Sequence, residues 1–162
     1  MTSLPDNCTF EQASLAEPLS VLVHAGRRAG LCKGQRILVL GVGTIGILAC
    51  ALAKSCGASH VLAIDINPQR LDFARANGFA CQTYCLPVVA KPKTSEEQLR
   101  AARENASRAL ATFRVPDGFD VVFECTGAEP CIQMSIYVST IVSHFRDMDR
   151  LSVCQTDCRD RW

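Results

Sequence analysis

Four residues in the first half of the chain have types and spacing suited to holding a dinucleotide. Gly41, Gly43 and Gly46 form a G-x-G-x-x-G in "ILVLGVGTIG". Asp65 follows after about 20 residues, the distance at which such a motif places an acid that hydrogen-bonds an adenosine ribose. The first glycine permits a tight turn, the second lets a pyrophosphate approach the backbone, and the third lets a helix pack closely on a strand. We expect a nucleotide cradle; the alternative is a glycine turn with an incidental aspartate.

The same acid bears on the choice of cofactor. A carboxylate at Asp65 would repel a 2′-phosphate, so the residues favour NAD(H) over NADP(H). Arg70 lies five residues after Asp65 and complicates this choice of cofactor. It could stack on adenine, or it could be a solvated cation in the first turn of its helix.

Alternating helices and strands position these residues. Apolar, β-branched runs predict buried strands, and capping residues, prolines and glycines mark the helix ends. We expect helices over 9–30 (broken at Pro18 and ending at Gly26 and Gly30), 44–56, 67–77, 95–113 and from 130, and strands over 35–41, 60–66, 79–85 and 119–127. The helix from Ser95 is expected to begin with a Ser95–Gln98 capping box and to bury Leu99, Ala102, Ala106, Leu110 and Phe113. This order predicts an α/β fold with a doubly wound parallel sheet.

Composition excludes several classes. The net charge is +1, which gives no footprint for nucleic acid or an anionic membrane. No apolar run is long enough to span a bilayer, and the N-terminus does not resemble a signal peptide. The ten cysteines lie mostly in apolar runs and include no C-x-x-C. Cys154 and Cys158 are not followed by a histidine, so a zinc site there is disfavoured and a reduced, cytoplasmic location is expected.

Several blocks together resemble a known family. The segments "EPLSVLVHAGRRAG", "ILVLGVGTIG", "VLAIDINPQRL" and "GFDVVFECTGAEPCIQMSIY" are similar to the zinc-dependent medium-chain dehydrogenases. The polyol branch, which contains sorbitol, xylitol and arabinitol dehydrogenases, is the most similar. The resemblance covers roughly Leu4 to Tyr137. It implies a Rossmann-type domain that binds NAD, a separate GroES-like domain with a catalytic zinc, hydride transfer from a sugar alcohol, and homo-oligomers.

The resemblance also implies roles for individual residues. The cofactor-binding positions are Gly41, Gly43, Thr44, Ile45, Gly46, Asp65, Arg70, Cys125, Thr126 and Gly127. Glu17, in "EPLSV", matches the family's glutamate at the zinc or its bound water. Taken without the resemblance, Glu17 is an acid near a helix kink. No catalytic residue is assigned in this chain.

Two features depart from the family pattern. The zinc ligands expected before Glu17 have no counterpart, so we expect the GroES-like domain to be absent. From residue 138 the tail "VSTIVSHFRDMDRLSVCQTDCRDRW" does not match the family's fifth and sixth strands. We therefore expect an incomplete Rossmann domain over residues 1–137, with an N-terminal linker helix, and an atypical tail over 138–162. The sheet should hold about four strands in the order 3-2-1-4, with the fourth strand at an edge.

Three functions remain open from the sequence. The first is an NAD-dependent polyol dehydrogenase, present here as a truncated and inactive fragment. The second is a non-catalytic dinucleotide-binding module that associates with a partner subunit. The third, a Rossmann methyltransferase, is disfavoured by the six-residue glycine spacing and the "EPLS" block.

Overall fold

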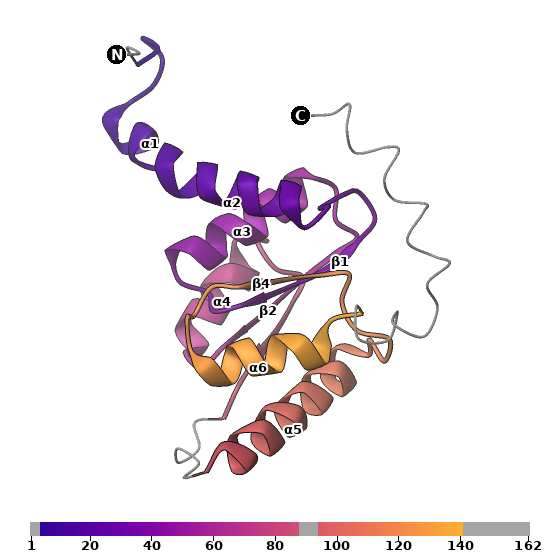
Figure 1. Ribbon diagram of the computed structural model, residues 1–162. Helices are drawn as coiled ribbons and strands as arrows, with labels where there is room; N and C mark the ends of the chain where they lie inside the picture. The colour runs from indigo at the N-terminus through magenta and orange to yellow at the C-terminus, as the bar shows by residue number, and fades with distance from the viewer. Residues whose placement is uncertain (1–3, 88–93, 141–162) are drawn as a thin grey trace.

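A four-stranded parallel sheet with helices on both faces forms the body of the molecule (Figure 1). The computed structural model describes residues 4–87 and 94–140. The elements are α1 (Phe10–Ser14), α2 (Ala16–Arg28), β1 (Arg36–Leu40), α3 (Thr44–Ser55), β2 (His60–Asp65), α4 (Pro68–Ala76), β3 (Gln82–Cys85), α5 (Ser95–Phe113), β4 (Val121–Glu124) and α6 (Glu129–Val138). The predicted alternation of helices and strands is confirmed. Within the described ranges, no helix is both long and apolar enough to cross a membrane.

The strand order is β3-β2-β1-β4, as predicted. β1 lies between β2 and β4 and is buried on both faces, since Ile37, Leu38 and Val39 have no exposed surface. The register aligns Leu40 with Ile64 of β2 and with Glu124 of β4. The loops that follow β1, β2 and β4 therefore leave the sheet at the same edge, the one formed by the carboxyl ends of the strands. That edge is where an open α/β sheet binds its ligand.

Each face of the sheet has its own core. Residues from α2, α3 and α4 pack on one face, around Ile37 and Val39. Residues from α5 and α6 pack on the other, around Leu38, Leu40 and Phe119. Figure 1 shows α2 and α3 on the opposite side of the strands from α5 and α6.

The N-terminal helix is divided as predicted, but the details differ. Thr9 and Gln12 form the predicted capping box, and the break falls at Leu15, so that Pro18 lies in the first turn of α2, where a proline is tolerated. Gly26 does not mark the helix end as expected. It is buried inside α2, and a Cβ there would lie 3.3 Å from Leu31, which follows the helix, and 3.5 Å from Leu52 of α3, so close packing explains the glycine. Gly30, with φ of 65°, follows the helix end.

Two other elements begin at different residues from those predicted. The cap of α5 is Thr94, whose hydroxyl accepts from Glu97 N at 3.2 Å, in place of the expected Ser95. Leu99 is 45% exposed because the buried face of α5 turns toward Ala109 instead. β3 begins at Gln82 and not at residue 79, because Phe79 N and Ala80 N both donate to Ala74 O at the end of α4. The Phe79 ring also stacks on Phe73 of α4.

The packed part of the chain continues past residue 137. Val138 is fully buried, and Ser139 forms a parallel bridge with Phe119. Thr140 N donates to Phe119 O at 2.9 Å. The expected boundary between residues 137 and 138 stays a prediction. The other expectations for the tail, including those for Cys154 and Cys158, fall on residues 141–162, outside the described residues.

Candidate functional site

Two of the three motif glycines are required by close contacts, and the third faces open space. Gly41 has φ of 85°, and a Cβ there would lie 2.5 Å from Thr126 Cγ2. A Cβ on Gly46 would lie 1.8 Å from Gly41 O, so α3 can pack on the loop only with glycine at this position. A Cβ on Gly43 would meet nothing within 4 Å. The glycine at position 43 therefore keeps open the side of the loop from which a ligand would approach.

The start of α3 offers hydrogen-bond donors. Gly43 is the N-cap, and no side chain caps the helix. The N–H groups of Thr44, Ile45 and Gly46 belong to the first turn, where a helix supplies no acceptor of its own. In α4, by contrast, Asn67 Oδ1 accepts from Gln69 N at 2.9 Å. The α3 terminus thus combines open donors with a partial positive charge, which suits a phosphate group.

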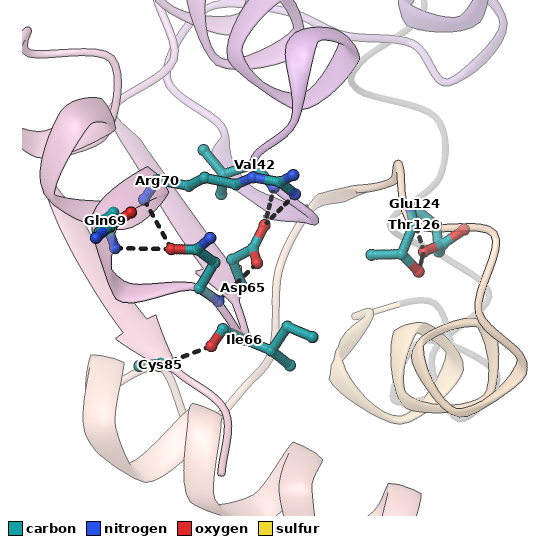
Figure 2. Close-up of polar contacts among 9 residues, drawn as sticks. Val42, Asp65, Ile66, Gln69, Arg70, Cys85, Glu124 and Thr126 are labelled. Atoms are coloured by element: carbon teal, nitrogen blue, oxygen red, sulfur yellow. Dashed lines mark hydrogen bonds and ion pairs between the residues drawn. The ribbon is translucent and has the colours of Figure 1, made fainter. Parts of the chain in front are cut away.

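Asp65, at the end of β2, anchors the glycine loop (Figure 2). The residue is only 7% exposed. Its Oδ2 accepts from Val42 N at 2.6 Å and its Oδ1 from Asn67 N at 2.9 Å. Arg70 Nη1 lies 4.0 Å from Oδ2, and the arginine side chain is largely exposed. A carboxylate can accept about four hydrogen bonds, so two backbone donors leave capacity for ribose hydroxyls.

A groove of about 420 Å³ opens beside the glycine loop. It is lined by Leu15, Val42, Gly43, Thr44, Ile47, Leu48, Arg70 and Phe73. Arg70 thus borders both Asp65 and the groove, and the α1–α2 junction at Leu15 lies across from the start of α3.

The turn after β4 is organised by a residue that the sequence reasoning missed. Glu124 Oε1 accepts from Thr126 N at 2.9 Å and also from the Thr126 hydroxyl (Figure 2). Glu124 Oε2 accepts from Gly127 N at 3.0 Å, and Thr126 Oγ1 accepts from Ala128 N at 2.9 Å. The threonine in "CTG" is a residue type that often bonds the backbone N–H two positions on, as Thr126 does with Ala128 N. An acid directly before such a turn is the signal that could have identified Glu124.

Two thiols next to this turn are poorly ionised. Burial, followed by the negative charge of Glu124, raises the pKa of Cys125 to about 11. Burial also raises the pKa of Cys131 on α6; a hydrogen bond with the Thr126 side chain lowers it in part, and the charges of Glu124 and Asp65 raise it further. The charges of Glu124 and Asp65 therefore both reach the Cys131 thiol. The thiols of Cys125 and Cys131 stay neutral near pH 7.

The predicted cofactor residues are brought together, while the predicted role of Glu17 at a metal stays a prediction. The glycine loop, Asp65, Arg70 and the Cys125–Gly127 turn share one edge of the sheet. Glu17 is exposed in the first turn of α2. The described residues contain no group of three or more His, Cys, Asp or Glu side chains that could hold a metal ion. These residues do not fit a catalytic zinc, which needs about three protein ligands. The cofactor roles of the individual residues stay predictions.

Comparisons with known proteins identify the family. The profile of the family described as zinc-binding dehydrogenase matches residues 44–141. D-xylulose reductase A of Aspergillus niger is 39% identical over 135 residues, which are 83% of this chain and 34% of that protein. The chain therefore spans about a third of the length of the curated relatives that it matches.

Solved structures agree with this assignment. Galactitol-1-phosphate dehydrogenase from Escherichia coli superimposes with a TM-score of 0.65 and 25% identity, covering 85% of this chain and 35% of that one. 2R,3R-butanediol dehydrogenase from Bacillus subtilis gives 0.59 and 29%, covering 86% and 35%. A Sinorhizobium meliloti protein solved with NADP gives 0.56 and 25%, covering 75% and 32%. With the Rossmann-type sheet, the glycine loop and the family profile in agreement, this chain belongs to the zinc-binding dehydrogenases.

Proposed function

We propose that this chain binds NAD(H) and forms the nucleotide-binding part of an oxidoreductase that acts on a sugar alcohol. The observation that carries the proposal is the open side of Gly43 next to the uncapped start of α3 and the Asp65 carboxylate. In the protein's working form NAD(H) supplies the hydride acceptor or donor. The chain's own residues bind the pyrophosphate and orient the adenosine half. The relatives named as a xylulose reductase and a galactitol-phosphate dehydrogenase support a polyol as the substrate class.

The arrangement around Asp65 supports NAD(H) over NADP(H). The carboxylate is buried and faces the loop, so a 2′-phosphate placed beside it would be repelled. Arg70, 4.0 Å away, offsets part of that charge. We therefore expect a preference of several-fold and not complete discrimination. Within the described residues, Cys50, Cys81, Cys85 and Cys125 are free thiols, which supports a reducing, cytoplasmic location.

Calorimetry on the purified chain tests the proposal. We expect NADH to bind more tightly than NADPH, and Gly43→Ala to weaken NADH binding while leaving the fold intact. Equal or tighter NADPH binding would contradict the role given to Asp65. Absence of binding to either nucleotide would exclude the cradle as a working site.

Asp65→Arg sharpens the test of cofactor choice, because arginine can make charge-assisted bonds to a 2′-phosphate. Asp65 also anchors Val42 N, so the variant's unfolding free energy must be measured alongside the two affinities. If the variant folds, we expect its NADH to NADPH preference to reverse. An unchanged ratio would mean that Asp65 does not face the ribose.

The alternative is a non-catalytic dinucleotide-binding module that works with a partner subunit. The described residues, which do not fit a zinc, favour it over independent catalysis. Hydride transfer in zinc dehydrogenases relies on the metal as a Lewis acid at the substrate oxygen. We expect the chain by itself to form no NADH from sorbitol, xylitol or arabinitol. Clear turnover, with one zinc per chain by elemental analysis, would refute this.

A further inference from the structure

We infer that Asp65 is also a positioning residue for the phosphate subsite. Its carboxylate fixes the glycine loop and, through the loop, the N–H groups at the start of α3. The ribose and the phosphates of a bound nucleotide then depend on the same side chain. This inference deepens the proposed function and rests on it. It gives Asp65 two separate tasks, one toward the ligand and one toward the loop.

Two neighbouring donors of the glycine loop are held by β2. Gly41 N donates to the backbone oxygen of Ile64 at 2.8 Å, which continues the pairing of Leu40 with Ile64. Val42 N donates to Asp65 Oδ2 at 2.6 Å, in a buried position. The strand backbone therefore holds the first glycine of the motif. A side chain holds the next residue, because the loop has left the strand pairing and a buried backbone N–H needs a partner.

The Asp65 carboxylate is itself fixed by the segment that follows it. Its Oδ1 accepts from Asn67 N at 2.9 Å, and the side chain is only 5% exposed. Asn67 Oδ1 in turn caps α4 by accepting from Gln69 N. The start of α4 thus sets the direction of the carboxylate, and the carboxylate sets the position of the Val42 N–H group.

The bond to Val42 lies directly before the open part of the loop. Val42 is buried in the core on the α3 side of the sheet, whereas a Cβ on Gly43 would meet nothing within 4 Å. Packing fixes the Val42 side chain, but it supplies no acceptor for the N–H group. Without the carboxylate the loop would have to shift to find another acceptor, and the donors at the start of α3 would shift with it.

The two tasks of Asp65 predict opposite effects on a phosphate ligand that cannot bond to the carboxylate. If Asp65 served only the ribose, removing its negative charge would leave the binding of such a ligand unchanged or make it tighter. If Asp65 also holds the loop, removing the carboxylate weakens that binding. Arg70 Nη1, 4.0 Å from Oδ2, already offsets part of the charge, so the electrostatic gain is small.

The test uses ADP and 2′,3′-dideoxy-ADP, which keeps both phosphates but has no ribose hydroxyls for a carboxylate to bind. Calorimetry measures both affinities for the full chain and for Asp65→Ala. We expect the substitution to weaken dideoxy-ADP binding about fivefold, as for one lost hydrogen bond, and to weaken ADP binding further because the ribose contacts are also lost.

Asp65→Asn is the second variant if Asp65→Ala does not fold. Its amide has one oxygen in place of two, so it cannot accept from Val42 N and Asn67 N through separate oxygens as the carboxylate does. We expect dideoxy-ADP to bind this variant at least about twofold more weakly. Unchanged or tighter dideoxy-ADP binding in whichever variant folds would overturn the inference.

Asp120→Ala is the matched control. Asp120 Oδ2 accepts from Arg36 N at 2.7 Å, so the two aspartates bind backbone N–H groups near opposite ends of β1. The control should lower the unfolding free energy and leave both affinities unchanged. An equal loss of dideoxy-ADP binding in the control would also overturn the inference, because it would indicate a general effect on the fold. If the unaltered chain binds neither ligand, the proposed function has failed. If the unaltered chain binds both and the Asp65 variant binds dideoxy-ADP as well as before, only the inference has failed.

Discussion

The β1–α3 loop and the β4–α6 turn leave neighbouring strands at the same edge of the sheet, but they use their backbone N–H groups in opposite ways. The loop is held from outside: Asp65 of β2 binds Val42 N, and the donors at the start of α3 stay open. The turn is held from inside: Glu124 of its own strand binds Thr126 N and Gly127 N. A segment anchored by a neighbour can offer its donors to a phosphate, whereas a segment that satisfies its own donors can serve only as a surface.

The largest effect that we expect tests the loop. Gly46→Ala places a Cβ 1.8 Å from Gly41 O. Because that oxygen belongs to the backbone, it cannot move away without shifting the loop, and the unfolding free energy should fall by about 3 kcal/mol or more. Urea unfolding followed by circular dichroism measures this.

Gly43→Ala is the matched control within the same loop. Its Cβ meets nothing and its φ is −79°, so the loss of stability should stay below about 1 kcal/mol. Similar losses in the two variants would contradict the division of the loop into a packed side and an open side.

A second prediction tests the contact between loop and turn. Gly41→Ala meets both a φ of 85° and the Thr126 methyl group, so we expect a loss of about 2 kcal/mol or more. Gly127→Ala is the control, since φ there is 67° with nothing within 4 Å, and it should cost only about 1 kcal/mol from backbone strain.

Thr126→Ser completes the double-mutant cycle. Serine removes Cγ2 but keeps the hydroxyl that bonds Glu124, so it should recover part of the stability lost in Gly41→Ala. If the changes in unfolding free energy of Gly41→Ala and Thr126→Ser were strictly additive, the Gly41 position and the Thr126 methyl group would not be in contact.

Sequence patterns were sufficient for the elements that depend on local rules. The apolar strands and the Asn67 cap follow from such rules, whereas the strand order was expected from the Rossmann pattern that the family resemblance implies; all three agree with the structure. The predictions differed where tertiary contacts decide. Gly26 is set by its packing on Leu31, and the exposure of Leu99 is set by the direction in which α5 lies on the sheet.

The candidate site was only partly visible in the sequence for the same reason. Gly41 has the positive φ, and Gly46 the close approach to Gly41 O, that the motif predicts for these glycines. The motif assigned Asp65 to a ligand, but not to Val42 N, a contact that depends on how two strands are aligned. Glu124 was missed because two of its three donors are backbone N–H groups, so its only signal in the sequence is its place directly before "CTG".

The smallest effect that we expect compares the buried thiols on the two sides. Cys50 on α3 has no exposed surface, and burial, with a smaller contribution from Cys125, raises its pKa to about 12. Cys125 in the turn is less enclosed, with a pKa of about 11. Only the thiolate is alkylated, and an ordinary cysteine has a pKa of about 8.5. In iodoacetamide labelling followed by peptide mass spectrometry, the exposed Cys81 and Cys85 should react first, then Cys125, and Cys50 last.

The pH dependence gives this last prediction its sign. At pH 8, a pKa of about 11 leaves Cys125 with on the order of 100-fold less thiolate than an ordinary cysteine, and its labelling rate should rise about tenfold per pH unit up to about pH 10. Between about pH 8.5 and 11 the unfolded chain loses this proton while the folded chain keeps it, so the unfolding free energy should fall as the pH rises. In denaturant all these thiols should react alike. If Cys125 in the folded chain were labelled as fast as Cys81, the turn would open readily, and Glu124 would not be holding it closed.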